Sequence, residues 1–159
     1  MKVSREKYLR YLIKNKSEYP ACDRWRVEEK EHDKYYIVKG NTFALDKDKT
    51  ISGISRTHTS KLKGKDILRK AIKKGGNKLQ AFGEKLYNFY TENGFIPVCI
   101  IKFDMNYAPK GCTQKDNLIL YYYKGSKQNM PYRQALKILP KYKTLDQGIE
   151  YRKIIMGEV

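Results

Sequence analysis

Basic side chains concentrate in one short stretch, and their type and spacing suggest a chemistry directly. Positions 65, 69 and 73 would form one row of i, i+4 neighbours on a helix, and the apolar residues between them would form the opposite face. Such cations can attract a polyanion; at minimum they predict a solvated basic face on a core-facing helix. The basic residues of this stretch are Lys61, Lys63, Lys65, Arg69, Lys70, Lys73 and Lys74.

The whole chain shares this basic character. Its 159 residues include 34 Lys and Arg against 17 Asp and Glu, which gives a formal net charge of +17. A field of this sign attracts nucleic acid, acidic proteins and phosphorylated cofactors alike. Because lysine is spread along the entire sequence, a purely solubilising role of the charge stays open as the alternative.

Length and composition predict one folded domain. The chain is 40% hydrophobic and contains 14 Tyr, 5 Phe and 1 Trp, which argues against wholesale disorder. No apolar run approaches the roughly 20 residues of a membrane span, and the charged start has no signal core. The three cysteines, Cys22, Cys99 and Cys112, are too widely spaced for a disulfide framework or a zinc site. We therefore expect a cytoplasmic protein with no metal and no membrane partner.

The first half reads as a helix followed by a meander. Ser4 can cap a helix that carries apolar residues at helical spacing. Strands are predicted over 35–38, 42–45 and 50–55, with a loop over 56–63. The basic helix then runs over 64–74 and ends at Gly75 and Gly76.

The second half alternates strands and helices. A strand over 78–82 precedes a helix over 83–93, whose expected apolar face carries Leu86, Phe89 and Tyr90. Strands over 95–103 and 117–123 flank a loop over 104–116. Helical patches over 136–139 and 145–156 close the sequence.

This order predicts an α/β fold with a mixed central sheet. We divide the expected domain into an N-terminal helical segment (1–34), a core (35–124) and a C-terminal helical extension (125–159).

One segment carries a family resemblance, the run from Leu86 to Phe95 in which Tyr90 precedes Gly94-Phe95 by four residues. It resembles the helix-to-strand signature of the Gcn5-related N-acetyltransferase superfamily, and the predicted elements over 35–123 follow the order of that fold. The runs 75–79 and 107–109 are also similar to small phage-encoded relatives, so we expect a phage origin and the host cytoplasm.

The resemblance implies a cofactor site for acetyl-CoA. In that superfamily the strands before and after the first central helix splay apart and admit the pantetheine arm, while the helix N-terminus holds the pyrophosphate. The resemblance also makes Tyr90 the general acid that protonates the departing thiolate. It places the cofactor on Ile51, Gly53, Ile54, Lys61, Leu62, Lys63, Gly64 and Lys65.

The phosphate loop departs from the family pattern. The family carries Gln/Arg-x-x-Gly-x-Gly/Ala, whereas this chain has Thr59 at the first position and Leu62 at the first glycine, so only Gly64 matches. Spacing does not single out a general base, which leaves His58, Asp46 and Glu84 open.

Two functions follow from these observations. The first is transfer of an acetyl group from acetyl-CoA to an amine. The alternative is a non-catalytic binding or structural protein of the same fold that uses its basic surface on nucleic acid or an acidic protein.

Overall fold

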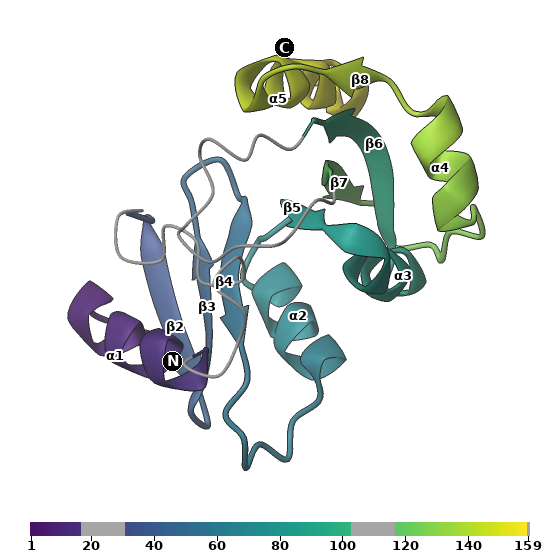
Figure 1. Cartoon of the computed structure of the whole chain (residues 1–159). Coiled ribbons are helices and arrows are strands. Elements are labelled where there is room, and N and C mark those ends of the chain that lie inside the picture. Colours follow the sequence, from purple (N-terminus) through teal and green to yellow (C-terminus); the bar gives the residue numbers. More distant parts are fainter. Residues whose placement is uncertain (17–30, 103–116, 159) are drawn as a thin grey trace. The chain divides into compact units, whose positions relative to one another are not determined.

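A computed structural model describes residues 1–16, 31–102 and 117–158 (Figure 1). These residues contain five helices and two four-stranded sheets, which confirms the predicted α/β class. They divide into two compact units, one within 1–77 and the other within 78–158.

The first unit is built on an antiparallel sheet of consecutive strands. Its strands are β1 (Lys2–Val3), β2 (Lys34–Val38), β3 (Asn41–Leu45) and β4 (Ile51–Ser55), in the order β1-β2-β3-β4. Lys39 and Gly40 join β2 to β3 and both have positive φ, at 50° and 84°. Two such residues make the tight turn whose twist matches a hairpin, so the predicted meander is confirmed.

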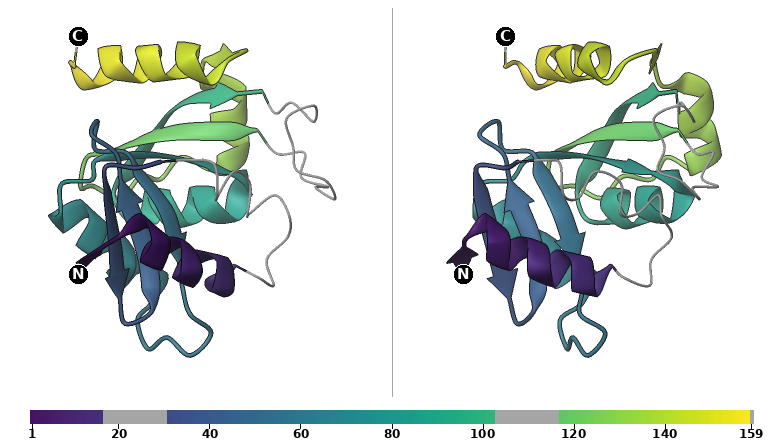
Figure 2. Two further views of the ribbon diagram at one scale, coloured as in Figure 1. Left: turned by 90° about the vertical axis from the view of Figure 1, so that its left-hand side faces the viewer. Right: turned by 60° about the vertical axis from the view of Figure 1, so that its left-hand side comes forward.

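Two helices cover opposite faces of this sheet (Figures 1 and 2). Helix α1 (Arg5–Asn15) begins where the Ser4 hydroxyl accepts a hydrogen bond from the Lys7 N–H, as predicted. It buries Tyr8 and Leu12 against Tyr35 and Ala44. The basic helix is α2 (Gly64–Lys73), which packs on β3 and β4.

The second unit is a sheet between helices. Its strands are β5 (Lys78–Phe82), β6 (Phe95–Ile101), β7 (Leu118–Tyr123) and β8 (Lys141–Tyr142), in the order β5-β7-β6-β8. Strand β7 is antiparallel to both neighbours, whereas β8 runs parallel to β6, so this sheet is mixed. Helix α3 (Gly83–Glu92) lies on one face and α5 (Leu145–Met156) on the other, with α4 (Tyr132–Ile138) beside α3 (Figure 1).

A buried arginine joins α5 to the sheet. Arg152 is only 1% exposed, and its guanidinium donates to the carbonyl oxygens of Leu79 and Tyr121 at 3.0 and 3.3 Å. It also donates to the Gln80 side-chain oxygen at 3.1 Å. These hydrogen bonds satisfy a charge that would otherwise be costly to bury.

The predicted apolar face of α3 is confirmed for Tyr90 and wrong for Leu86. Leu86 is 38% exposed, whereas Tyr87 is 1% exposed and Tyr90 is 8% exposed. Tyr87 can replace Leu86 in the core because its hydroxyl donates to the Met130 carbonyl at 2.6 Å. The helical spacing therefore predicted the helix and the burial of Tyr90, but it missed Tyr87 as the second large core residue.

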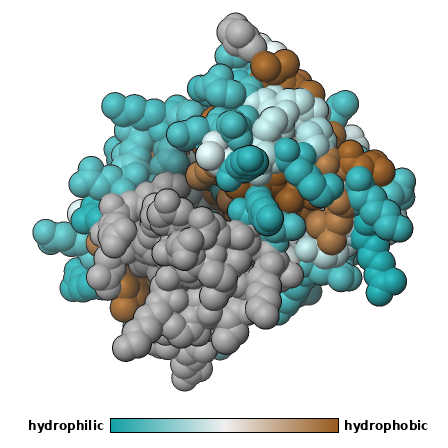
Figure 3. Space-filling view, turned by 45° about the horizontal axis from the view of Figure 1, so that its top comes forward, coloured by the Kyte–Doolittle hydropathy of each residue, from teal (hydrophilic) through white to brown (hydrophobic). Residues whose placement is uncertain are grey.

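Of the cysteines, only Cys99 lies among the described residues. Cys99 is fully buried in β6, as expected of a small packed side chain. Cys22, Cys112 and the run 107–109 lie outside the described residues. No helix of the described ranges is long and apolar enough to span a membrane. On the face drawn in Figure 3, hydrophilic side chains predominate and hydrophobic ones form separate patches.

Gly53 provides a test of the packing of α1 on β4. Its φ is +61°, and a Cβ at this position would lie 1.8 Å from the Tyr8 hydroxyl oxygen. We expect Gly53→Ala to lower the free energy of unfolding by about 2 kcal/mol more than Gly75→Ala, which carries only the backbone cost of about 1–2 kcal/mol. Gly75 is a matched control, because its φ is +108° and no atom lies within 4 Å of the added Cβ.

Urea unfolding measures both variants. Adding Tyr8→Phe to Gly53→Ala removes the nearest atom and should recover part of the loss, because the next atom is the ring carbon at 3.0 Å. Equal losses from Gly53→Ala and Gly75→Ala would contradict this packing.

Candidate functional site

The first part of the candidate site is the outer edge of β4. Among the described residues β4 pairs only with β3, so its other edge carries backbone groups with no strand partner. The register against β3 shifts between Thr42 and Ala44, and Gly53 has positive φ. A bulge bends the strand and leaves a residue outside the ladder. The edge can therefore offer hydrogen-bond donors and acceptors to an extended ligand that carries amides.

The three predicted residues of this strand contribute mainly backbone. The Ile51 side chain is buried beside Gly76, where an added Cβ would lie 2.4 Å from it. The Tyr8 hydroxyl covers Gly53, and the Gly53 carbonyl accepts from the Thr42 hydroxyl at 2.9 Å. Ile54 is half-buried.

The second part is the N-terminus of α2, where the resemblance places the phosphates. Two of its predicted amide donors are already used. The Leu62 N–H donates to the Ser60 hydroxyl at 3.1 Å, and the Lys63 N–H donates to the Asp66 carboxylate at 2.9 Å. Gly64 and Lys65 occupy the first two helical positions, whose N–H groups have no intrahelical partner. Within the described chain these two amides remain available to an anion.

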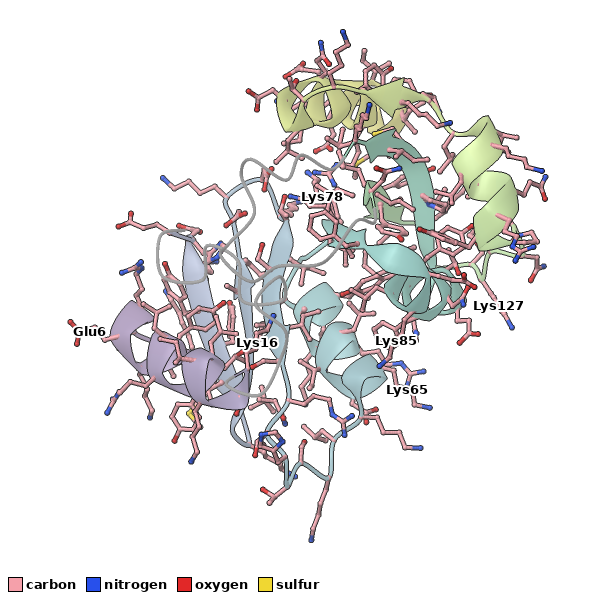
Figure 4. The ribbon with its side chains drawn as sticks, in the orientation of Figure 1. Glu6, Lys16, Lys65, Lys78, Lys85 and Lys127 are labelled. Carbon is pink, nitrogen blue, oxygen red and sulfur yellow. The ribbon has the colours of Figure 1, made fainter. Side chains whose placement is uncertain are left out.

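Asp66 changes the electrostatics of this helix end. Its carboxylate lies at the helix N-terminus, where the dipole is positive, and therefore occupies a position that a bound anion would also favour. The side chains of Lys61, Lys63 and Lys65 are exposed, and Figure 4 shows Lys65 at the start of α2. The sequence analysis missed the role of Asp66, although an acidic residue at the third helical position is a capping signal.

Tyr90 lies in the second unit, inside a group of aromatic rings. Its ring centroid is 5.2 Å from that of Phe89, 5.8 Å from that of Phe95 and 5.6 Å from that of Tyr121. Burial raises the pKa of Tyr90 to about 12. The phenol therefore keeps its proton at neutral pH, which is the state that a general acid needs.

Tyr121 is a neighbour that the sequence analysis left out. It is fully buried on β7, and its hydroxyl makes no hydrogen bond with the described residues. A buried hydroxyl without a partner is unusual. Three consecutive residues of β7, Ile119 to Tyr121, are buried because both faces of the strand are covered, and the pairing of β7 between β5 and β6 places Tyr121 beside Tyr90.

The three residues left open as general base lie apart from one another along the chain. His58 is exposed in the loop after β4, and Glu84 is exposed in the first turn of α3. Asp46 follows β3 and contacts the ring of His32. No group of three metal-binding side chains occurs in the described part of the chain.

The burial of Tyr90 predicts a pH effect on stability. Its pKa is about 12 in the folded chain against 10 for a free tyrosine, so the unfolded chain loses its proton first as the pH rises above 10. We expect this group to cost about 1 kcal/mol of stability at pH 11 relative to pH 8. Tyr90→Phe should therefore lose less stability than the wild type over that interval in urea unfolding. Identical pH dependence of the two proteins would contradict it.

Comparison of the chain with protein-family models, with curated proteins and with solved structures finds no match.

Proposed function

We propose that this chain is an acyl-CoA-dependent N-acyltransferase of the Gcn5-related type, which transfers an acetyl group to an amine. The observation that carries the proposal is the arrangement around α2. Strand β4, before this helix, is the last strand of one sheet, and β5, after it, is the first strand of the other. The resemblance requires that the strands flanking this helix are not paired with each other.

The chemistry assigned to each part follows from what it offers. The outer edge of β4, which pairs with no strand among the described residues, can bond the amides of the pantetheine arm, as an added strand would. The amides of Gly64 and Lys65 and the three exposed lysines can hold the phosphates. The resemblance assigns to Tyr90, which stays protonated, the proton that the thiolate takes as it leaves.

The phosphate-binding part also fits the chain's departure from the family motif. With Leu62 and Lys63 amides satisfied internally, binding has to depend more on lysine side chains than on a glycine-rich backbone. Lysine acts on phosphate as a point charge. The affinity for the cofactor should therefore fall with salt more steeply than in a backbone-held site.

Calorimetric titration with acetyl-CoA tests the proposal, together with an assay of acetyl transfer by Tyr90→Phe. We expect the variant to bind acetyl-CoA within about twofold of the wild type and to transfer the acetyl group about 100-fold more slowly, as loss of a general acid costs. Tyr122→Phe is the matched control, since Tyr122 packs on the α5 side of the same sheet. Absence of binding by the wild type at millimolar acetyl-CoA would refute the function.

A second function is favoured by one specific observation. Within the described residues, none of the exposed cations of α2 forms an ion pair. A helix face of unpaired positive charge suits the phosphates of a nucleic acid. The protein would then bind nucleic acid and catalyse no reaction. The residues of this face are Lys65, Arg69, Lys70, Lys73 and Lys74.

Two double charge reversals separate these functions. If the start of α2 holds a cofactor phosphate, Lys63→Glu with Lys65→Glu should weaken acetyl-CoA binding at least tenfold, because each lysine lies at the helix end. Lys73→Glu with Lys74→Glu should leave that binding nearly unchanged and cost a little stability, because Lys74 also lies over the Tyr36 ring at 5.8 Å.

Fluorescence anisotropy with a labelled DNA duplex measures the nucleic-acid affinity of the same two double variants. A diffuse nucleic-acid binder should lose similar affinity from either pair, since counterion release depends on the number of charges. Equal losses of acetyl-CoA binding from the two pairs would refute the cofactor site at the start of α2.

A further inference from the structure

The segment that joins β7 to α5 in the second unit is strongly basic and has no role in the site described above. It belongs to the longest stretch of the sequence without an aspartate or a glutamate, which runs from Asp116 to Asp146. We call residues 124–143 of this stretch the basic tract. Its cations are Lys124, Lys127, Arg133, Lys137, Lys141 and Lys143.

The cations of the basic tract are exposed and have no charged partner. All of them are exposed, and none forms an ion pair with another described residue. Figure 4 shows Lys127 in the part of the tract that precedes α4. The described carboxylates of this unit lie on α3, on α5 and directly after α5. Positive charges that have no carboxylate among them create a potential that attracts anions.

The basic tract is fixed to its unit at both ends. At its start, the N–H groups of Lys124 and Gly125 donate to the Gly94 carbonyl at 2.8 and 3.0 Å. At its end, the Ile100 N–H donates to the Pro140 carbonyl at 2.9 Å, where β8 pairs with β6. The backbone that carries the cations is therefore ordered before any ligand binds, which lowers the entropic cost of binding.

Helix α3 holds the middle of the tract and determines which side of α4 is exposed. The Tyr87 hydroxyl donates to the Met130 carbonyl at 2.6 Å, just before α4. On α4, Ala135 is fully buried. Arg133 and Lys137 are each two positions from Ala135, so they lie on the opposite side of the helix, and their spacing of four residues places them on one face. The packing of α4 therefore turns both cations outward.

The basic tract follows β6 from one end to the other (Figure 1). Gly94, which binds its start, directly precedes β6, whereas β8 pairs with Ile100 and Ile101 at the end of β6. A strand of this length spans about 20 Å. One strand of a nucleic-acid duplex carries about six phosphates over that distance. A single phosphate group can contact one end of the tract, whereas a polyanion can contact both.

The composition of the tract favours a nucleic acid over an acidic protein. Interfaces between proteins are enriched in apolar and aromatic side chains at their centre and are depleted in lysine. Within this described tract all cations but Arg133 are lysines, and Ile138, at 56%, is the one large apolar side chain that is exposed. Exposed lysine and arginine side chains are the groups that bind nucleic-acid phosphates.

We propose that the basic tract binds the sugar–phosphate backbone of a nucleic acid. Contacts to phosphate carry no sequence information, so this binding is independent of base sequence. Each phosphate that the tract neutralises releases counterions, and the affinity therefore falls as the salt concentration rises. The tract lies wholly in the second unit, so the inference depends neither on the proposed acyl transfer nor on the basic face of α2.

The test measures fluorescence anisotropy of a short labelled DNA duplex of mixed sequence with the full-length chain, over a range of sodium chloride concentrations. Three double variants each remove two charges from the tract. We expect each of them to weaken binding about tenfold and to lower the slope of log affinity against log salt by about 1–2. The variants are Lys124→Gln with Lys127→Gln, Arg133→Gln with Lys137→Gln, and Lys141→Gln with Lys143→Gln.

A matched control removes two charges from the same unit outside the tract. Lys85 is exposed on α3 and Lys153 is exposed on α5. Lys85→Gln with Lys153→Gln should bind the duplex within about twofold of the wild type, because neither lysine belongs to the tract. Thermal unfolding checks that all four double variants retain the fold.

Two further ligands identify the kind of polyanion. A single strand of the same sequence separates the two forms of nucleic-acid backbone, and the expected losses with either form support the proposal. Polyglutamate of the same length represents an acidic protein. If polyglutamate binds at least as tightly as both nucleic acids, the proposal is refuted in favour of an acidic partner.

The remaining outcomes are also decisive. Absence of binding by the wild type at low salt would refute the proposal, as would losses from fewer than two of the three tract variants. Equal losses from the control and the tract variants would show that net charge alone attracts the ligand. Calorimetry with acetyl-CoA is a separate measurement, so failure of the tract leaves the proposed acyl transfer standing, and failure of acetyl-CoA binding leaves the tract standing.

Discussion

Buried tyrosine is the constraint on which both units depend. Tyr8 is 1% exposed in the first unit, and Tyr87 and Tyr121 are 1% and 0% exposed in the second. A buried phenol contributes a large apolar area, but its hydroxyl needs a hydrogen-bond partner and enough space in the core. A backbone carbonyl accepts from the Tyr87 hydroxyl and a glycine leaves room for the Tyr8 hydroxyl, whereas the Tyr121 hydroxyl has no partner among the described residues. These contacts fit α1 to its sheet at Gly53 and join α3 to the segment before α4.

The same constraint sets the chemistry available in each unit. Burial raises the pKa of the core tyrosines and keeps them as neutral proton donors. In the second unit this leaves Tyr90 protonated beside Tyr121. In the first unit the rings of Tyr8 and Tyr35 lie edge-on to His32, whose Nδ1 contacts the Asp46 carboxylate. Packing and reactivity are therefore properties of the same residues.

Local signals in the sequence predicted the elements well. Ser4 predicted the start of α1, and the apolar runs between turn residues predicted the strands of the meander. Strands β1 and β8 have two residues each, which is too short for any periodic pattern. They form because β1 pairs with the edge of β2 and β8 with the edge of β6, and this pairing depends on the tertiary structure.

The candidate site was less accessible to sequence reasoning. The basic residues at the start of α2 were identified from their spacing, and Asp66 was overlooked among them although its position is a local signal. The contact of His32 with Asp46 depends on the register of β2 against β3, which composition does not encode. The resemblance indicated Tyr90, but the ring of Tyr121 beside it follows from the position of β7 in the sheet.

The buried Arg152 has a consequence for how the chain matures during synthesis. Its guanidinium joins carbonyls of β5 and β7, yet it sits on α5, the last helix of the described chain. The described strands and helices of the first unit all come from residues 1–77. Since segments fold as they leave the ribosome, the amino-terminal unit can acquire its sheet early. The hydrogen bonds from Arg152 to β5 and β7 of the other sheet can form only after α5 has emerged.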